Sequence, residues 1–585
     1  MTDSNVTIIK KDVKKFRVKP NLSDYDKTCK TFSWEKAAKK YITFFEDGTL
    51  NIAYNCIDRH AKNDKKNKIA LLFEGAKGEK EKYTYAQLKK LTDKFANVLE
   101  DNDVRKGDRV FLFLPPIPER YVAFFGTLKI GAIAGTLFAA FQEAALRDRL
   151  ADSEAKIVIT NAALYPRIEK IRKDLPHLKK VIIVERGSVT RPTGKDLVFY
   201  NHAMQQAETE FEMAHMEKTD FSYMLYTSGT TGKPKGVMHT HGDVLQAMVT
   251  TKYVLDIQDN DIYWCTADLG WVTGVVYGAL GPWGLGATQV MFEGRFSPES
   301  WYTVMQDYQV TLWYTAPTAI RMLMGQNVSP KDYNLSALRQ IYSVGEPLNP
   351  EAIWWGLEVF GLPFHDTWWQ TELGGISITN YPAMDIKPGS MGRPLPGIKA
   401  AIIDDDGREI TEDREGNLAL LASSVSSLMK TVWHNEEKFQ SYFKDKWYIS
   451  GDRAYKDADG YFWFIGRADD VINTSGERVG PFEVESSLVE YPDVLEAGVI
   501  GKPDMMRGEI IKAFVVVKQG IARTDELKTK LQQHVKKHLA GHAFPREIEF
   551  IDKLPKTRSG KIMRRILKAK ELGLPIGDTS TLEDY

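Results

Sequence analysis

The feature that most constrains the fold is a repeated alternation of short apolar runs with amphipathic stretches. From Arg109 the run RVFLFL is followed by a proline pair, an amphipathic stretch that ends at Gly131, and a second apolar run, AIAGTLF. This alternation predicts βαβ units, because parallel strands need a crossover that is usually helical and right-handed. A second series runs from YMLYTSG, starting at Tyr223, to PEAIWWGLEVF, ending at Phe360. The sequence therefore predicts an α/β protein with two doubly wound sheets.

The pattern changes in the last third of the chain. After Asn417 the apolar runs become shorter, and DG dipeptides at 406–407 and 459–460 indicate tight turns, so we expect a small antiparallel β region. The order of elements then becomes helix, strand, strand, helix, which is typical of a compact α+β unit. We therefore expect a large N-terminal domain at 1–467 and a small C-terminal domain at 468–585.

Charge and composition exclude several classes of protein. Lys plus Arg number 78 and Asp plus Glu number 78, so no net charge favours nucleic acid or an anionic membrane as a partner. Cys29, Cys56 and Cys265 are too few and too widely spaced for a disulfide framework or a zinc site, which favours a reducing compartment. The first thirty residues lack the apolar stretch of an export signal, and Lys129 interrupts the most apolar region, Tyr121–Phe141. We expect a cytoplasmic protein.

One loop carries the strongest chemical signal. The segment YTSGTTGKPKG, residues 226–236, follows an apolar run and combines glycines, hydroxyls and lysines. Glycines let backbone N–H groups approach phosphate oxygens, hydroxyls donate hydrogen bonds, and lysines supply positive charge. Pro234 occupies a position that a Walker loop requires to be Gly, so this is a different phosphate loop. Composition alone leaves a solvated hairpin turn as the alternative.

The same loop resembles the signature of the adenylate-forming superfamily, which includes acyl-CoA synthetases, peptide-synthetase adenylation domains and firefly-type luciferases. Further segments resemble its other motifs, in the order that the superfamily shows. They are SVGEP (343–347), DTWWQTE (366–372), SGD (450–452), GRADD (466–470), SGER (475–478) and PKTRSGK (555–561). The segments NIAYNCIDRHA (51–61), YWCTADLGWVTG (263–274), DTWWQTE and LPKTRSGKIMRR are similar to those of AMP-forming acetyl-CoA synthetases, and the similarity spans about residues 25–575.

This resemblance implies a ligase that converts acetate, ATP and CoA to acetyl-CoA, AMP and pyrophosphate through acetyl-AMP. Mg²⁺ would accompany ATP, and Glu372 resembles the carboxylate that helps to place it, since Mg²⁺ prefers hard oxygen ligands. The residues that the resemblance assigns to the nucleotide are Thr227, Ser228, Gly229, Thr230, Thr231, Lys235, Gly345, Glu346, Pro347, Asp366, Thr367, Trp368, Trp369, Gln370, Thr371, Asp452, Arg467 and Arg478.

Trp369 is expected to set the size of the acid. An indole at the end of an acyl pocket occupies the volume that a longer chain would need, and the resemblance pairs a tryptophan here with acetate. Val272, Thr273 and Val344 are its expected neighbours. Because one methylene contributes only about 1–3 kcal/mol to discrimination, we expect poor use of propionate rather than none. Without the surrounding motifs, packing in the core would explain this tryptophan equally well.

Lys561 resembles the catalytic lysine of the superfamily. Its ammonium would bridge the attacking carboxylate and the α-phosphate, and no acid or base is needed because acetate is ionised at pH 7. The resemblance implies that the C-terminal domain swings about a hinge at Asp469 between the two half-reactions. The residues expected to contact CoA after the swing are Thr273, Ser475, Gly476 and Lys536, the last standing where the family often has arginine. Acylation of Lys561, by a lysine acyltransferase opposed by a deacylase, would remove its charge.

Three other functions remain open from the sequence. The first is a synthetase for propionate or another short acid, with the same mechanism. A luciferase-like oxidoreductase would need a bulky pocket, which Trp369 disfavours, and a catalytically silent nucleotide-binding module would not release AMP. His239 and His241 form an H-x-H pair, but no further ligands lie nearby in the sequence, so we assign them no zinc.

Overall fold

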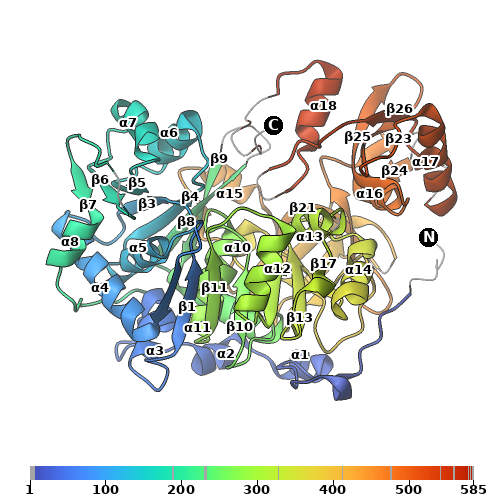
Figure 1. The fold of residues 1–585 in the computed structure, drawn as a ribbon. Coiled ribbons are helices and arrows are strands. Elements are labelled where there is room, and N and C mark those ends of the chain that lie inside the picture. Colours follow the sequence, from blue (N-terminus) through green and yellow to red (C-terminus); the bar gives the residue numbers. More distant parts are fainter. Residues whose placement is uncertain are drawn as a thin grey trace.

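The computed structural model describes residues 7–187, 190–228, 234–326, 328–411, 413–474, 477–539, 542–557, 560–576, 579 and 582. Within these residues the strands form three sheets of eight, fourteen and five strands. Figure 1 shows the first two sheets side by side, with the third, from the C-terminal part of the chain, lying above them. The α/β class and the doubly wound arrangement predicted from the sequence are confirmed.

The eight-stranded sheet has the order β19-β9-β8-β4-β3-β5-β6-β7. Six neighbouring strands from β8 to β7 are parallel, and the unit predicted from Arg109 is β3–α5–β4. Its strands are β3 (Arg109–Phe113), β4 (Ile133–Leu137), β5 (Ile157–Asn161), β6 (Lys180–Val184), β7 (Leu197–Phe199), β8 (Phe221–Ser228), β9 (Pro234–Thr240) and β19 (Thr431–Val432). Its helices are α4 (Tyr85–Asp101), α5 (Pro118–Lys129), α6 (Glu143–Asp152), α7 (Tyr165–Ile171) and α8 (Tyr200–Gln206).

The fourteen-stranded sheet combines a parallel centre with an antiparallel extension. The parallel strands are β1 (Ile69–Glu74), β10 (Ile262–Cys265), β11 (Thr288–Phe292), β12 (Leu312–Thr315), β13 (Gln340–Val344) and β14 (Phe364–Trp368), with β2 (Lys80–Thr84) antiparallel at the edge. The accompanying helices are α9 (Val244–Tyr253), α10 (Val272–Val275), the π-helical turn η5 (Val276–Leu280), α11 (Gly281–Gly284), α12 (Pro298–Asp307), α13 (Pro317–Met324) and α14 (Pro350–Phe360).

The small β region differs from its prediction in extent and attachment. It begins before Asn417 and is continuous with the large sheet, because two short antiparallel strands, β15 and β16, carry the hydrogen bonding across to β22. These strands are β15 (Ile378–Thr379), β16 (Ser390–Pro394), β17 (Ala400–Ile403), β18 (Gly416–Leu421), β20 (Phe443–Lys444), β21 (Trp447–Lys456) and β22 (Phe462–Arg467). Helix α15 (Glu436–Gln440) precedes β20.

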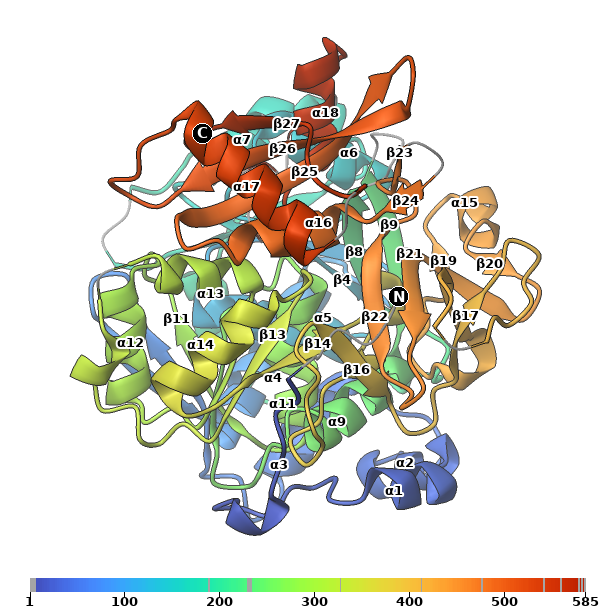
Figure 2. The same cartoon turned by 90° about the vertical axis from the view of Figure 1, so that its right-hand side faces the viewer.

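The five-stranded sheet forms the C-terminal part of the molecule. Its strands are β23 (Ile472–Thr474), β24 (Glu477–Val479), β25 (Val494–Asp504), β26 (Gly508–Val517) and β27 (Glu547–Phe550), with helices α16 (Pro481–Val489), α17 (Asp525–His538) and α18 (Arg564–Leu572). Figure 2 shows this part lying across the rest of the molecule, above α13 and α14. At the opposite end lie α1 (Tyr25–Thr31), α2 (Trp34–Tyr41), the π-helical turn η2 (Tyr54–Asp58) and α3 (Arg59–Ala61).

The most apolar region of the sequence, Tyr121–Phe141, lies largely buried inside the protein. It forms α5 and β4, and Lys129 at the end of α5 is fully buried between Asp58, at 2.8 Å, and Asp93, at 2.5 Å. Two carboxylates compensate the buried ammonium, which is the condition for keeping a charge in a core. Among the described residues, no helix combines the length and apolar character needed to span a membrane.

Candidate active site

Four chain segments that carry sequence motifs meet at one place, on or directly after strands β13, β14, β21 and β22. Strands β13 and β14 are parallel neighbours, with Ser343 opposite Asp366, so the residues that follow both strands emerge at the same sheet edge. Strands β21 and β22 pair Asp452 with Arg467. Gly345 has φ +95°, a left-handed conformation that glycine adopts without strain, and it turns the chain directly after β13.

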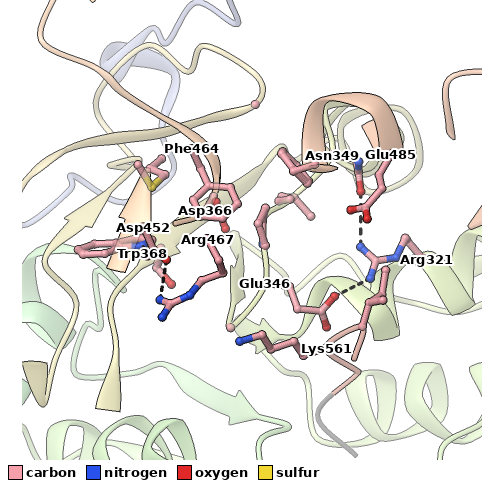
Figure 3. A pocket seen from close by; sticks show the side chains of 18 of the residues that line it. Arg321, Glu346, Asn349, Asp366, Trp368, Asp452, Phe464, Arg467, Glu485 and Lys561 are labelled. Carbon is pink, nitrogen blue, oxygen red and sulfur yellow. Dashed lines mark hydrogen bonds and ion pairs between the residues drawn. The ribbon is translucent and has the colours of Figure 1, made fainter. Parts of the chain in front are cut away.

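These segments and Lys561 enclose a cavity of about 190 Å³. Its lining includes residues of the rest of the molecule together with Glu485, Glu496 and Arg564 of the C-terminal part (Figure 3). The sequence-predicted residues that line it are Gly345, Glu346, Pro347, Asp366, Thr367, Trp368, Trp369, Gln370, Asp452, Arg467 and Lys561. The structure therefore brings eleven of the predicted residues to one place, and their individual roles stay predictions.

The Asp452 carboxylate is held by three side chains. Arg467 Nη1 donates to Oδ1 at 2.7 Å, while Trp368 Nε1 and Gln370 Nε2 donate to Oδ2 at 2.9 and 3.2 Å. Tyr448 donates its hydroxyl to Gln370 Oε1 at 2.8 Å. A buried carboxylate with this many donors keeps one orientation, as a group that positions a ligand must.

Asp366 is the second buried carboxyl of the cavity. Ser343 Oγ donates to its Oδ1 at 2.6 Å. Burial raises the pKa of Asp366 to about 7, and the bond from Ser343 only partly offsets this effect. The Asp366 carboxyl therefore takes up or releases its proton near neutral pH.

Lys561 extends its amine into the cavity between Glu346 and Arg467 (Figure 3). Burial by the surrounding protein lowers the pKa of Lys561, and the positive charge of Arg467 lowers it further, while Asp452 and Asp470 act in the opposite direction. The side chain stays accessible to water within the cavity, which moderates the effect of burial. An ammonium group that lines a cavity of this size can contact two anionic oxygens of a ligand at once.

The residues predicted to form the acyl pocket lie in and against one hydrophobic cluster. Val344 is part of the cluster, and Val272 and Trp369 pack against it, while Thr273 is buried in α10. The Trp369 ring meets the ring of Tyr277 edge to face, with centroids 5.1 Å apart. This packing fits both a pocket wall and a core residue, so the role of Trp369 stays a prediction.

The phosphate loop is only partly described. Gly229, Thr230 and Thr231 lie outside the described residues, and Ser228 ends β8 beside Thr227. Lys235 lies on β9, where burial lowers its pKa; Lys438 lowers it further and Glu372 raises it. One oxygen of Glu372, Oε1, accepts a hydrogen bond from Tyr442 at 2.9 Å.

Four of the remaining predicted residues are described by the structure and do not line the cavity. Arg478 is exposed on β24, and Lys536 is exposed on α17, its Nζ 5.7 Å from the centroid of the Phe544 ring. Asp469 is exposed in the turn after β22, 3.8 Å from Arg467 Nε. Thr371 begins a short turn next to the pocket, and its carbonyl oxygen contacts His239 Nε2 at 2.9 Å. Ser475 and Gly476 lie outside the described residues.

The histidine pair has no metal-binding geometry. His239 Nδ1 contacts Asp243 Oδ2 at 2.7 Å, and His241 Nδ1 accepts the N–H of Ile52 at 3.2 Å. Burial lowers the pKa of His241 to about 3, so its ring is neutral at pH 7. Among the described residues no group of three or more His, Cys, Asp or Glu side chains is arranged to hold a metal.

Comparison with protein families identifies the architecture. A model described as "AMP-binding enzyme" matches residues 57–432, and one described as "AMP-binding enzyme C-terminal domain" matches residues 483–561. The chain belongs to the AMP-binding enzyme family. This membership confirms the superfamily resemblance found in the motifs, and the second match falls on the part that carries Lys561.

Members of this family match over almost the whole chain. A Bacillus subtilis (strain 168) protein named acetyl-coenzyme A synthetase is 54% identical over 567 residues, which covers 96% of this chain and 98% of the relative. A Methanothrix thermoacetophila protein of the same name is 40% identical and covers 93% and 86%. A solved Brucella canis acyl-CoA synthetase superposes with a TM-score of 0.73 at 34% identity, covering 94% of this chain and 99% of that one. An anthranilate CoA ligase in complex with anthranoyl-AMP gives 0.81 at 30% identity, covering 90% and 98%.

Several lining residues of this AMP-binding enzyme were not found from its sequence. Arg321, Asn349, Glu485 and Glu496 line the cavity, yet none lies in a recognised motif. Arg564 also lines it and donates to Glu485, at 2.5 Å from Nη2 to Oε2. Of these residues, the sequence draws attention only to Arg564, through the basic run in which it lies. The others reach the cavity through contacts between segments that are far apart in the chain, and such contacts leave no local pattern.

Proposed function

We propose that this chain converts acetate, ATP and CoA to acetyl-CoA, AMP and pyrophosphate. A carboxylate oxygen of acetate attacks the α-phosphorus of ATP, an O–P bond forms, and pyrophosphate leaves. The thiolate of CoA then attacks the carbonyl carbon of acetyl-AMP, a C–S bond forms, and AMP leaves with the electron pair of the C–O bond. The acid enters already ionised, so the first step needs no proton transfer.

The observation that carries this proposal is the combination of Trp369 and Lys561 in one cavity with the nucleotide motifs. Relatives named acetyl-coenzyme A synthetase, up to 54% identical over nearly the full length, support acetate as the acid. The packing of Trp369 against Tyr277 supports a short acid, because an indole at the end of the acyl pocket would occupy the volume that a longer chain needs. Lys561 supports adenylation, since its ammonium can compensate charge that moves between carboxylate and phosphate.

The two reactions need different surroundings at one site. The matched C-terminal region carries Lys561 and is joined to the rest of the molecule by hydrogen bonds, from the Thr318 hydroxyl to the Gly560 carbonyl and from Asn349 to Ser486. We assign residues 1–467 and 468–585 to two domains, with the hinge at Asp469, so that rotation removes Lys561 after the first reaction and admits CoA for the second. Thr273, Ser475, Gly476 and Lys536 are the residues assigned to CoA in the rotated arrangement.

Three finer features belong to the same proposal. Mg²⁺ enters with ATP, and Glu372, with one oxygen bonded to Tyr442, offers its other oxygen to the ion or to its water shell. Acylation of Lys561 by a lysine acyltransferase, reversed by a deacylase, would stop adenylation by removing the charge. The enzyme acts in the cytoplasm, consistent with three cysteines that form no disulfide among the described residues.

The test is AMP formation from ATP with acetate, propionate, butyrate and benzoate side by side, each with and without CoA. We expect turnover to be fastest with acetate, slower with propionate and dependent on CoA. Faster turnover with propionate or butyrate would contradict acetate as the substrate and leave the mechanism in place. AMP release with none of the acids would contradict the enzymatic function and favour a nucleotide-binding module.

A further inference from the structure

Helix α13 lies directly against the segment that carries Lys561. Thr318, in the first turn of this helix, is buried, and its hydroxyl oxygen lies 2.9 Å from the carbonyl oxygen of Gly560. Gly560 has φ +92°, and a Cβ at this position would lie 2.2 Å from the Cβ of Thr318. The backbone next to Lys561 therefore touches α13 so closely that only glycine fits there.

The Thr318 hydroxyl also connects this contact to the nucleotide turn. It lies 2.8 Å from Glu346 Oε1 and accepts a hydrogen bond from Arg321 Nη2 at 2.9 Å. Arg321 Nη2 donates to Glu346 Oε2 at 2.6 Å as well (Figure 3). A hydroxyl has one proton, so Thr318 donates either to Glu346 or to the Gly560 carbonyl while it accepts from Arg321.

Arg321 lies on the same helix, α13, and is close to charged side chains of the C-terminal part. Its Nε lies 3.9 Å from Glu496 Oε1, and Glu496 also accepts from Lys556, five residues before Lys561. Hydrogen bonding and an ion pair thus connect Thr318 and Arg321 to the C-terminal part. Such contacts exchange for water at small net cost, unlike an apolar interface, so they suit a surface that separates in every catalytic cycle.

We propose that Thr318 and Arg321 are positioning residues that dock the Lys561 segment for formation of the acyl-adenylate. They hold the backbone at Gly560 so that the Lys561 amine enters the cavity beside Glu346. The inference rests on the proposed function, because Thr318 affects catalysis only by positioning Lys561, the residue to which that function assigns adenylation. These contacts exist only while Lys561 occupies the cavity, so they act on the first half-reaction and not on the second.

The experiment measures the two half-reactions separately in the full-length chain. Acetate-dependent exchange of pyrophosphate into ATP reports adenylation, and acetyl-CoA formation from supplied acetyl-AMP and CoA reports thioester formation. Thr318→Val keeps the shape of the side chain and removes the hydroxyl. We expect it to lower the exchange rate about 10- to 100-fold and to leave thioester formation within about twofold.

Three further variants sharpen the result. Gly560→Ala should show the same split, because its Cβ would displace the segment from Thr318. Met322→Ala changes an exposed residue of the same helix, 40% exposed, and should leave both half-reactions unchanged. The double variant Thr318→Val/Lys561→Ala should be no slower in exchange than Lys561→Ala alone, since Thr318 acts through the lysine.

Two outcomes separate this inference from the proposed function. Suppose that Lys561→Ala loses exchange. If Thr318→Val then keeps the wild-type exchange rate, or if Thr318→Val slows both half-reactions equally, the docking role of Thr318 is overturned and the role of Lys561 stands. If Lys561→Ala itself keeps normal exchange, the mechanism under the proposed function is wrong. If the two substitutions lower the exchange rate additively in the double variant, the inference is also overturned, because Thr318 would then act independently of Lys561.

Discussion

Two sides of the same cavity are held in place by different kinds of contact. On one side Trp369 rests against Tyr277, whose hydroxyl is fixed by Thr250 at 2.8 Å and by the N–H of Ile376 at 2.7 Å. Tyr277 and Ile376 are buried members of one large hydrophobic cluster, and Trp369 packs against it. On the other side Lys561 follows a segment that α13 holds by hydrogen bonds and ion pairs.

The difference matches the role that we propose for each side. A wall that excludes larger acids by overlap must not move, and close apolar packing provides this rigidity. A lysine that enters and leaves needs contacts that water can replace. Burial raises the pKa of two carboxyls near this junction, Glu351 of α14 and Glu483 of α16, and the negative charges of Glu490 and Glu415 act in the same direction.

The largest expected effect comes from removing the mobile group itself. Lys561→Ala should lower adenylation about 10³-fold, because no other charge replaces the ammonium at the transition state, and should leave thioester formation within a few-fold. Pyrophosphate exchange and conversion of supplied acetyl-AMP measure the two effects. Lys568→Ala, a half-exposed lysine of α18, is the control. Equal loss in both half-reactions would contradict the difference between the two sides.

The carboxyls at the junction should make stability depend on pH. Burial raises the pKa of Glu351 and of Glu483 to about 7, so the folded protein binds more protons than the unfolded chain between pH 4.5 and 7. Their stabilising contribution is complete below about pH 4.5 and is lost as the pH rises through 7, up to about 3 kcal/mol for each group. Glu351→Gln and Glu483→Gln should each reduce the loss of unfolding free energy between pH 5 and pH 8, measured with urea.

A matched variant tests whether position matters for this effect. Glu358→Gln removes a charge from an exposed position of α14, the helix that carries Glu351. If it changes the pH dependence as much as Glu351→Gln does, burial at the junction is not the cause. The two buried glutamates lie at separate contacts, so the effects of the double variant should add.

Removing the rigid wall should change the choice of acid. Trp369→Gly opens the end of the pocket and should shift the ratio of kcat/KM for butyrate over acetate by about 30-fold, or about 2 kcal/mol, toward butyrate. Trp354→Ala, a partly exposed tryptophan of α14, is the control and should leave the ratio unchanged. An unchanged ratio in Trp369→Gly would remove Trp369 from the pocket wall.

The smallest expected effect concerns the support of that wall. Tyr277→Phe keeps the ring against Trp369 but leaves the N–H of Ile376 without its acceptor. We expect a looser wall and a shift toward butyrate of about fivefold, or about 1 kcal/mol, in the same direction as for Trp369→Gly. Tyr333→Phe, in a different hydrophobic cluster, serves as the control. A loss of stability with no change in selectivity would show that Tyr277 acts only on folding.

Local patterns were sufficient to predict the βαβ unit from Arg109 and the residues that turn after β13 and β14. In these regions neighbouring residues determine the structure, because alternating apolar runs specify strands and helices, and Gly345 allows the turn. Patterns of this kind could not predict that Arg321 and Glu496 line the cavity, because the two residues that meet there are 175 positions apart in the chain. They also did not reveal that the small β region continues the large sheet, since pairing between strands is a long-range property.

The sequence by itself determined the fold class, the superfamily and the eleven motif residues that line the cavity, because its motifs are short and chemically distinctive. Tertiary structure alone decided how those residues are held. It placed Tyr277 behind Trp369 and Thr318 against Gly560, although neither Tyr277 nor Thr318 lies in a motif. The reason is physical: rigidity and docking depend on which surfaces meet after folding, and burial and hydrogen bonding between distant segments exist only in the folded chain.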